Sequence, residues 1–311
     1  MIRQFALPTW GSKMTEFITA ILTSLSSGAI YALMALAIVL VWRSTRVINF
    51  AQAGQAVLTT YIGYTVIQRT GSYWLALVVA VISGAIIGAV IDRFFMRPIF
   101  KRVKSGPIVM IAPVVATLGL LGIIQAIIGF IWGLTNQSIE APVSTGGYKV
   151  MGKVIAFSSY NLLVLVAVAI AMLLLTILFQ RTNIGLALRA SAYSPEIARL
   201  SGIKVDAVRT LGWAIAGASG GLAGMLYIPG YFLYPNAMDL LLVFGFVAAV
   251  IGGLESLFGA VAGAMILGFA INFSTTYISQ KLFFPTAFIV LVLVLLIKPS
   301  GLFAAKKSRG A

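Results

Sequence analysis

Long apolar runs separated by short polar segments make up most of the chain. A helix that crosses the hydrocarbon core of a membrane needs about 20 mostly apolar residues. Nine runs approach this length: Phe17–Trp42, Ala53–Gln68, Tyr73–Ile91, Pro107–Gly133, Tyr160–Gln180, Leu211–Pro229, Leu240–Leu254, Leu257–Ser279 and Phe283–Ile297. The second, seventh and ninth are short, and such segments are tolerated inside a membrane protein where they line a cavity. The pattern predicts an all-α polytopic transmembrane helical bundle with about 8–10 spans.

The composition supports this prediction and excludes several classes of protein. Of the 311 residues, 60% are apolar and 9% are charged, and the mean hydropathy is +1.05. Soluble domains are about 45–50% apolar and about a quarter charged, so this chain cannot cover a soluble globule with polar groups. It also has no Cys and no His, which argues against thiolate metal sites and imidazole bases. We therefore expect no metal, no cofactor and no enzymatic activity.

The basic residues predict the orientation of the bundle. The chain has 22 Lys and Arg against seven Asp and Glu, and the bases lie in short segments between apolar runs, which favours a membrane over a nucleic acid. Sixteen bases fall on one side: Arg43, Arg46, Arg93, Arg97, Lys101, Arg102, Lys104, Arg181, Arg189, Arg199, Lys204, Arg209, Lys298, Lys306, Lys307 and Arg309. Six fall on the other: Arg3, Lys13, Arg69, Lys149, Lys153 and Lys281. The positive-inside rule places the N-terminus outside and the C-terminus in the cytoplasm.

These spans divide the chain into three parts and two long loops. We expect an external N-terminal segment at 1–16, a transmembrane domain at 17–297 and a basic cytoplasmic tail at 298–311. The first apolar run is long enough to remain as a span, and residues 1–13 lack the features of a cleaved signal. The external loop 134–159 contains Gly146-Gly147 between β-branched residues, which indicates a small hairpin.

The cytoplasmic loop 181–210 contains a signal for a short helix. Ser194 is a suitable N-cap, Pro195 suits the first helical position, and Glu196 places an acid in the first turn. Ile197, Leu200 and Ile203 then follow at helical spacing on one face. We expect a short amphipathic helix on the cytoplasmic surface.

Two motifs resemble catalytic signatures but are better explained by structure. The segment from Gly147 to Lys153 has the GxxxxGK spacing of a nucleotide-binding loop, yet Val154 replaces the required Ser or Thr. The segment from Gly217 to Gly221 spells G-x-S-x-G, but it lies in an apolar run of a chain without histidine. Glycines four residues apart let helices approach closely, and the pattern recurs at Gly84/Gly88, Gly129/Gly133, Gly220/Gly224 and Gly259/Gly263.

The polar residues inside the spans are neutral. No Asp or Glu falls at the centre of a predicted span, where secondary carriers commonly keep an ionisable coupling group. Five neutral side chains on or beside the short second span are candidates for lining a translocation path: Asn49, Gln52, Gln55, Thr59 and Thr60. The alternative for each is an interhelical hydrogen bond, the commoner role of a lone buried amide.

Three stretches resemble one family. They run from Ser27 to Leu36 and on through Val47 to Gln52, from Gly185 to Ala190 and on through Glu196 to Gly224, and from Gly252 to Gly263. In order and spacing they are similar to the permease subunits of bacterial ABC importers for branched-chain amino acids, and to the H-type member of the permease pair. Within the second stretch, Glu196, Ala198 and Gly202, followed by Ile203, fit the E-x-A-x-x-x-G pattern that such permeases place on a cytoplasmic coupling helix.

The resemblance implies a function and a set of partners. It implies a multi-pass protein of the bacterial inner membrane that forms half of a translocation path and has no ATPase activity of its own. Two cytoplasmic ATP-binding subunits, a second homologous permease and an external solute-binding protein would complete the importer. The family usually has glycine where Ala53 stands and Gly-Ala-Tyr where Thr59-Thr60-Tyr61 stands. These departures leave urea, short amides or aromatic acids open as substrates. The rival class is a self-powered secondary carrier or channel, and a sugar-type ABC permease is a third alternative.

Overall fold

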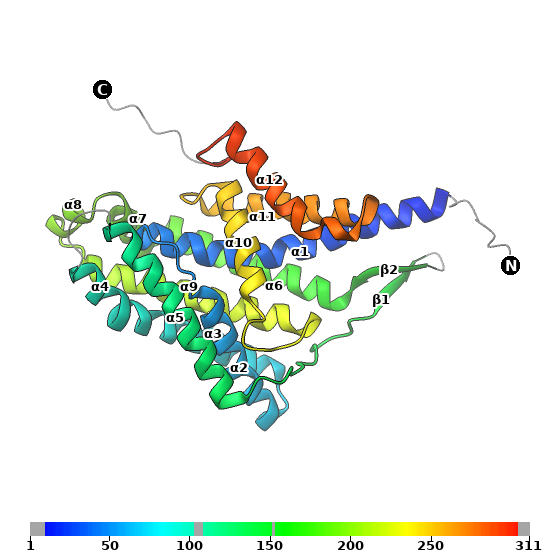
Figure 1. The fold of residues 1–311 in the computed structure, drawn as a ribbon, viewed down its shortest axis with the longest axis horizontal. Coiled ribbons are helices and arrows are strands. Elements are labelled where there is room, and N and C mark those ends of the chain that lie inside the picture. Colours follow the sequence, from blue (N-terminus) through cyan, green and yellow to red (C-terminus); the bar gives the residue numbers. More distant parts are fainter. Residues whose placement is uncertain (1–9, 103–107, 151–152, 304–311) are drawn as a thin grey trace.

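The computed structural model describes residues 10–102, 108–150 and 153–303. Within these ranges, nine long helices follow the nine predicted runs (Figure 1). They are α1 (Trp10–Thr45), α2 (Gln52–Thr70), α3 (Tyr73–Val90), α5 (Ile108–Trp132), α6 (Ser159–Arg181), α9 (Val205–Tyr227), α10 (Asp239–Gly252), α11 (Leu257–Tyr277) and α12 (Phe283–Ile297). The shorter elements are the π-helix η1 (Ile91–Met96), the helices α4 (Arg97–Arg102), α7 (Asn183–Tyr193) and α8 (Pro195–Leu200), and the 3-10 turns η2 (Ile228–Gly230) and η3 (Gln280–Leu282).

Seven of the described helices are long and apolar enough to cross a membrane. The two others among the nine are α2, which has 19 residues but many polar ones, and α10, which has 14 residues. Both correspond to runs that the sequence marks as short. The predicted all-α polytopic bundle is therefore confirmed, and the chain is a multi-pass membrane protein.

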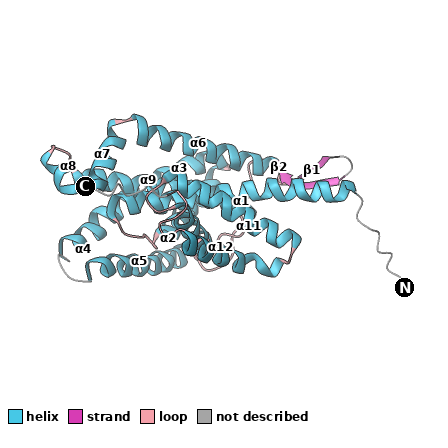
Figure 2. Ribbon diagram, turned by 90° about the horizontal axis from the view of Figure 1, so that it is seen from above, coloured by secondary structure: helices cyan, strands magenta, loops and turns pink. Residues whose placement is uncertain are grey.

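The bundle has buried central helices and apolar outer helices. Helix α1 packs against α6, α9, α10 and α11, and most of its span is buried. Helix α2 packs against α3, α5, α9 and α10, so it too lies inside the bundle (Figure 2). By contrast, α5, α6 and α12 leave most of their apolar spans exposed. Exposed apolar helix faces are what a lipid environment requires, so these helices form the outer layer.

Close glycine contacts explain the small-residue pattern. Gly84 on α3 faces Gly217 on α9, and a Cβ added to either residue would overlap the carbonyl oxygen of the other. Gly263 on α11 meets the backbone of α10 in the same way. Gly133 differs, because it follows the end of α5 with φ at +81° and has open space around it. The packing interpretation thus holds for the α3–α9 and α10–α11 crossings but not for Gly133.

Two strands form the predicted hairpin in the loop 134–159. Strands β1 (Gly147–Val150) and β2 (Lys153–Ser158) pair antiparallel, at the end of the molecule where α1 begins (Figure 1). Gly152 of the GxxxxGK spacing lies outside the described residues. Because a strand and not a helix follows Lys153, this segment is not a nucleotide-binding loop.

Helices α4, α7 and α8 lie at the end of the molecule opposite the hairpin (Figure 1). The predicted sixteen-base side includes these helices and their connections, so the charge asymmetry coincides with the long axis of the bundle. Helix α1 begins at Trp10, before the start of the first span predicted at 17. The division at 1–16, 17–297 and 298–311 and the direction of insertion stay predictions.

Candidate functional site

The five polar residues proposed from the sequence gather in the interior of the bundle. Asn49, Gln52, Gln55, Thr59 and Thr60 are each 0–1% exposed. Gln52, Gln55 and Thr59 are spaced three and four residues apart, which places them on one face of α2. The face extends over about 10 Å of helix, roughly a third of the hydrocarbon thickness.

The hydrogen bonds of this cluster are incomplete. The Asn49 side-chain amide donates to the Gln52 carbonyl oxygen at 3.3 Å, and the Gln52 amide donates to the backbone oxygen of Ala216 on α9 at 3.0 Å. The Gln55 side chain has no hydrogen-bond partner on either its nitrogen or its oxygen, and the Asn49 side-chain oxygen also lacks one. A buried amide without partners is costly, at about 1–3 kcal/mol for each unsatisfied group.

The two threonines are satisfied by their own helix. Both hydroxyls donate to the backbone oxygen of Ala56, Thr59 at 2.9 Å and Thr60 at 2.7 Å. Gly224 on α9 lies against the Thr60 hydroxyl, and Gly220 lies against the Gln52 amide. The free hydrogen-bonding capacity of the cluster therefore lies mainly on the side chains of Gln55 and Asn49.

The predicted surface helix is present as α8. Its first residue is Pro195, and the Ser194 hydroxyl accepts a hydrogen bond from the backbone nitrogen of Ile197 at 3.4 Å. The helix ends at Leu200, three residues before the predicted end at Ile203. Gly202 takes a left-handed φ of +81°, which L side chains rarely adopt, and the chain leaves the helix there.

The residues of the coupling pattern have different environments. Glu196 is exposed, whereas Ala198 is 3% exposed and packs into the subunit. Gly202 borders open space, and Ile203 is half-buried beyond the helix. The exposed apolar surface is instead formed by Ile197 at 62%, Leu200 at 89% and the preceding Tyr193 at 91%. Sequence spacing identified Ile197 and Leu200 but not Tyr193, which ends α7.

A buried ion-pair network joins η1 to the start of α9. The Asp92 carboxylate is 0% exposed and accepts hydrogen bonds from Arg209 at 2.8 Å, Arg97 at 3.2 Å and Thr210 at 2.6 Å. Arg97 also donates to the backbone oxygen of Asp206. The sequence places Asp92 beside a group of bases, but no spacing rule pairs it with residues more than 100 positions away. Two members of the network, Arg209 and Thr210, lie on α9, the helix that follows α8 in the chain.

A second polar contact lies at the opposite end of the bundle. The Gln125 amide on α5 donates to both oxygens of the Asp239 carboxylate at 3.0 and 3.1 Å. Asn236 donates to the same carboxylate at 3.1 Å. Nearby, the loop 134–159 pairs with the segment before α10 through Gln137 and Leu233. These contacts join α5 and the loop that follows it to the start of α10.

An apolar bundle that encloses neutral amides and exposes a short helix at its basic end has the features of a membrane permease. The sequence model of the family described as "Branched-chain amino acid transport system / permease component" matches residues 20–297. The chain belongs to this family, and it is therefore a transport permease subunit of the inner membrane rather than a catalytic enzyme.

Named relatives agree with this assignment. The probable branched-chain amino acid transport permease protein LivH of Methanocaldococcus jannaschii is 32% identical over 87% of both chains. The high-affinity branched-chain amino acid transport system permease protein LivH of Escherichia coli K12 is 29% identical over 92% of this chain and 95% of its own. A shorter match, 29% identical over 31% of this chain and 27% of the other, is to the nucleoside ABC transporter permease protein NupB of Lactococcus lactis.

Proposed function

We propose that this chain forms one half of the translocation path of an ABC importer for branched-chain amino acids. In this proposal a second homologous permease forms the other half. Two cytoplasmic ATP-binding subunits supply the energy, and an external solute-binding protein delivers the substrate. Family membership and the names of the LivH relatives support the substrate class.

The observation that carries the path proposal is the unpartnered amide of Gln55 in the middle of the bundle. A neutral amide can donate to a carboxylate and accept from an ammonium group, so it can bind either end of a zwitterion weakly. A charged residue would hold such a solute too firmly for rapid passage. The path then runs along Asn49, Gln52, Gln55, Thr59 and Thr60 when the surrounding helices separate.

In this proposal ATP hydrolysis is coupled to the path by helix movements that begin at the basic end of the molecule. We infer that α8 docks on an ATP-binding subunit through Ile197 and Leu200, with Glu196, Ala198, Gly202 and Ile203 shaping the helix and its exit. The Asp92 network connects the start of α9 with η1 and α4, so in this proposal a displacement of α8 moves these elements together. Gly217 and Gly221 on α9 pack against α3, while Gly220 and Gly224 on the same helix pack against α2, so a movement of α9 would reach the amide cluster.

The rival proposal is a self-powered carrier or channel. All seven acidic residues lie in the described parts of the chain, and Asp92, the one that is fully buried, is bound by two arginines. A carboxylate held in this way is a poor coupling site for protons or sodium ions, which favours the ABC importer. Because the match to NupB covers a third of the chain, a nucleoside is the second substrate class to test.

A substitution at Gln55 tests the path. Gln55→Met removes the unpartnered amide at similar volume, and a purely structural amide without partners is lost at little or no cost in stability. We expect normal abundance but leucine uptake by the complete importer reduced roughly two- to tenfold, the value of one hydrogen bond. The measurement is uptake of radiolabelled leucine into proteoliposomes that contain the importer.

Asn272→Leu is the matched control. Asn272 is also an intramembrane amide, but it donates to the Gly268 backbone oxygen of its own helix at 2.9 Å. Its replacement should leave uptake near the wild-type rate. Unchanged uptake in Gln55→Met would assign Gln55 a packing role and remove the amide cluster from the path.

A further inference from the structure

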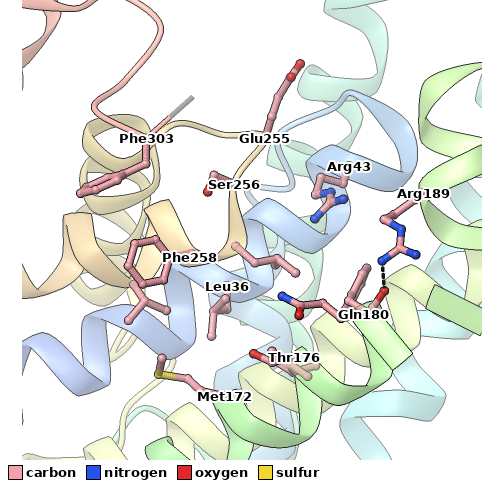
Figure 3. A pocket seen from close by; sticks show the side chains of 14 residues that line it. Leu36, Arg43, Met172, Thr176, Gln180, Arg189, Glu255, Ser256, Phe258 and Phe303 are labelled. Carbon is pink, nitrogen blue, oxygen red and sulfur yellow. Dashed lines mark hydrogen bonds between the residues drawn. The ribbon is translucent and has the colours of Figure 1, made fainter. Parts of the chain in front are cut away.

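A groove lies between helices at the basic end of the bundle. Helix α1 forms its floor, α6 and α11 form its walls, and Arg189 on α7 lies at one end, with a cavity volume of about 430 Å³ (Figure 3). This volume is within the usual range of small-molecule sites, about 300–1,000 Å³. The groove is separate from the amide cluster, because none of the five proposed path residues lines it.

The deep part of the groove is apolar. Leu36 lines its floor, and its sides are lined by Met172, Leu175, Phe258, Val261 and Phe303. Leu36 precedes Arg43 by seven residues on α1, so it lies about 10 Å deeper along the helix axis. Phe258 is 71% exposed at the start of α11, so the groove is open on this side. The groove therefore extends from the charged end of the bundle into the hydrocarbon region.

Two arginines lie at the charged end of the groove. Arg43 stacks over the Phe179 ring at 5.5 Å, and Arg189 donates a hydrogen bond to the Phe179 backbone oxygen. Within the described residues neither arginine forms an ion pair with a carboxylate, since the nearby Glu255 pairs with Arg46. Figure 3 shows the Glu255 side chain directed away from both arginines. Glu255 also lines the mouth of the groove, but it pairs with Arg46, so Arg43 and Arg189 leave the mouth with a net positive charge.

We propose that this groove binds one anionic phospholipid from the membrane leaflet at the basic end of the bundle. Arg43 and Arg189 hold the phosphate, since guanidinium groups match phosphate geometry and basic pockets between transmembrane helices bind anionic headgroups. One acyl chain lies along Leu36, Met172 and Val261. The chain beyond Phe303 carries further bases, Lys306, Lys307 and Arg309, so its charge does not suit it as the occupant.

This proposal depends on the membrane location of the chain and not on its substrate or path. A bound lipid would join α6, α1 and α11 at the point where α7 leads into α8. It would therefore stabilise the wall of the bundle next to the helix that we propose to dock on the ATPase.

Lipid retention by the complete importer tests the proposal. The importer, purified in mild detergent, is incubated with mixed phosphatidylglycerol and phosphatidylcholine, and native mass spectrometry counts the lipids that stay bound. We expect the wild type to retain phosphatidylglycerol in preference, and the double variant Arg43→Gln/Arg189→Gln to lose this preference by on the order of tenfold. Val261→Trp, which fills the apolar wall and leaves both arginines, should lose the same lipid.

The control is Arg93→Gln/Arg102→Gln, which removes the same charge from exposed residues outside the groove. It should retain phosphatidylglycerol like the wild type. Equal retention in the groove variants and the control would overturn the proposal. Displacement of the lipid by millimolar inorganic phosphate would identify a free anion as the ligand and also overturn it. Retention by the isolated chain but not by the importer would show that a partner subunit covers the groove, with the same consequence.

Discussion

Asp92 and Gln55 are both buried polar side chains, yet their hydrogen bonding is opposite. The Asp92 carboxylate receives three side-chain hydrogen bonds, two of them from arginines. The Gln55 amide receives none. A buried charge must be compensated or it destabilises the fold, whereas an unpaired neutral amide costs less and can be kept for function. The contrast supports a structural role for Asp92 and a transport role for Gln55.

Asp92→Asn should destabilise the bundle. The substitution leaves Arg97 and Arg209, which are 22% and 16% exposed, without their counter-charge. Removing one partner of a buried ion pair typically costs about 3–5 kcal/mol. We expect a lower melting temperature of the detergent-purified protein and reduced abundance in the membrane.

Glu255→Gln is the control for that substitution. It breaks the exposed pair with Arg46, whose side chains are 51% and 58% exposed, and such pairs contribute about 0–1 kcal/mol. A melting temperature of Asp92→Asn equal to that of Glu255→Gln would mean that the network does not stabilise the fold.

The sequence was sufficient to name the polar residues but not to find their partners. The neutral polar side chains of α2 interrupt an apolar run, so the sequence alone is enough to identify them. Whether Gln52 or Gln55 lacks a partner depends on α9, whose Ala216 is 164 positions from Gln52. The same limit applies to Asp92 and Arg209, since charge and spacing along the chain do not specify a contact at such separation.

At the scale of elements, α8 is a short helix whose apolar side chains face away from the bundle. Six residues cannot form a stable helix alone, because short helices depend on packing for their stability. Ala198 supplies some of that packing on the inner side. The outward position of Leu200 and Ile197 is explained if a partner covers them.

Leu200→Asp should weaken association with the ATP-binding subunit. Leu200 is 89% exposed in the chain, so its replacement should cost the folded bundle about 0.5 kcal/mol or less. In a docked complex the same aspartate would be buried without a partner, which costs several kcal/mol. We expect normal abundance, loss of co-purified ATPase and loss of uptake.

Leu134→Asp provides the comparison, because Leu134 is 78% exposed but follows the last residues of α5, at the end of that helix farther from α4. It should keep both the ATPase and transport. Co-purification of the ATPase at wild-type levels with Leu200→Asp would show that α8 is not the docking helix.

The element boundaries show which local signals are strong. Ser194-Pro195 predicts the start of α8 correctly, because the Ser194 side chain caps the helix by a local hydrogen bond from the Ile197 backbone nitrogen. The end differs from the prediction since apolar spacing continued to Ile203, while the left-handed backbone at Gly202 ends the helix earlier. Glycine pairs in the sequence predicted close helix crossings, but only the structure shows that α3 crosses α9. A sequence pattern identifies a face, and the partner of that face depends on the whole fold.

At the scale of the whole molecule, the basic residues are concentrated at one end of the long axis of the bundle. The hairpin β1–β2 and the start of α1 lie at one end of the bundle, and α4, α7 and α8 lie at the other (Figure 1). Bases are concentrated at the second end. The proposed docking of α8 depends on this polarity, since ATP is available only in the cytoplasm.

The charge distribution predicts that the α8 end is cytoplasmic, and cysteine labelling tests this. The chain has no native Cys, so single cysteines report unambiguously. Ser144 and Ser201 are exposed at opposite ends of the bundle, and exposed substitutions of this kind change stability by about 0.5 kcal/mol or less. In intact cells a membrane-impermeant maleimide should label Ser144→Cys but not Ser201→Cys. Permeabilised cells should show labelling of both, which controls for accessibility.

Labelling of Ser201→Cys from outside would reverse the orientation that the positive-inside rule predicts. It would also place α8 where no ATPase could bind it, so the coupling proposal would fail with the topology.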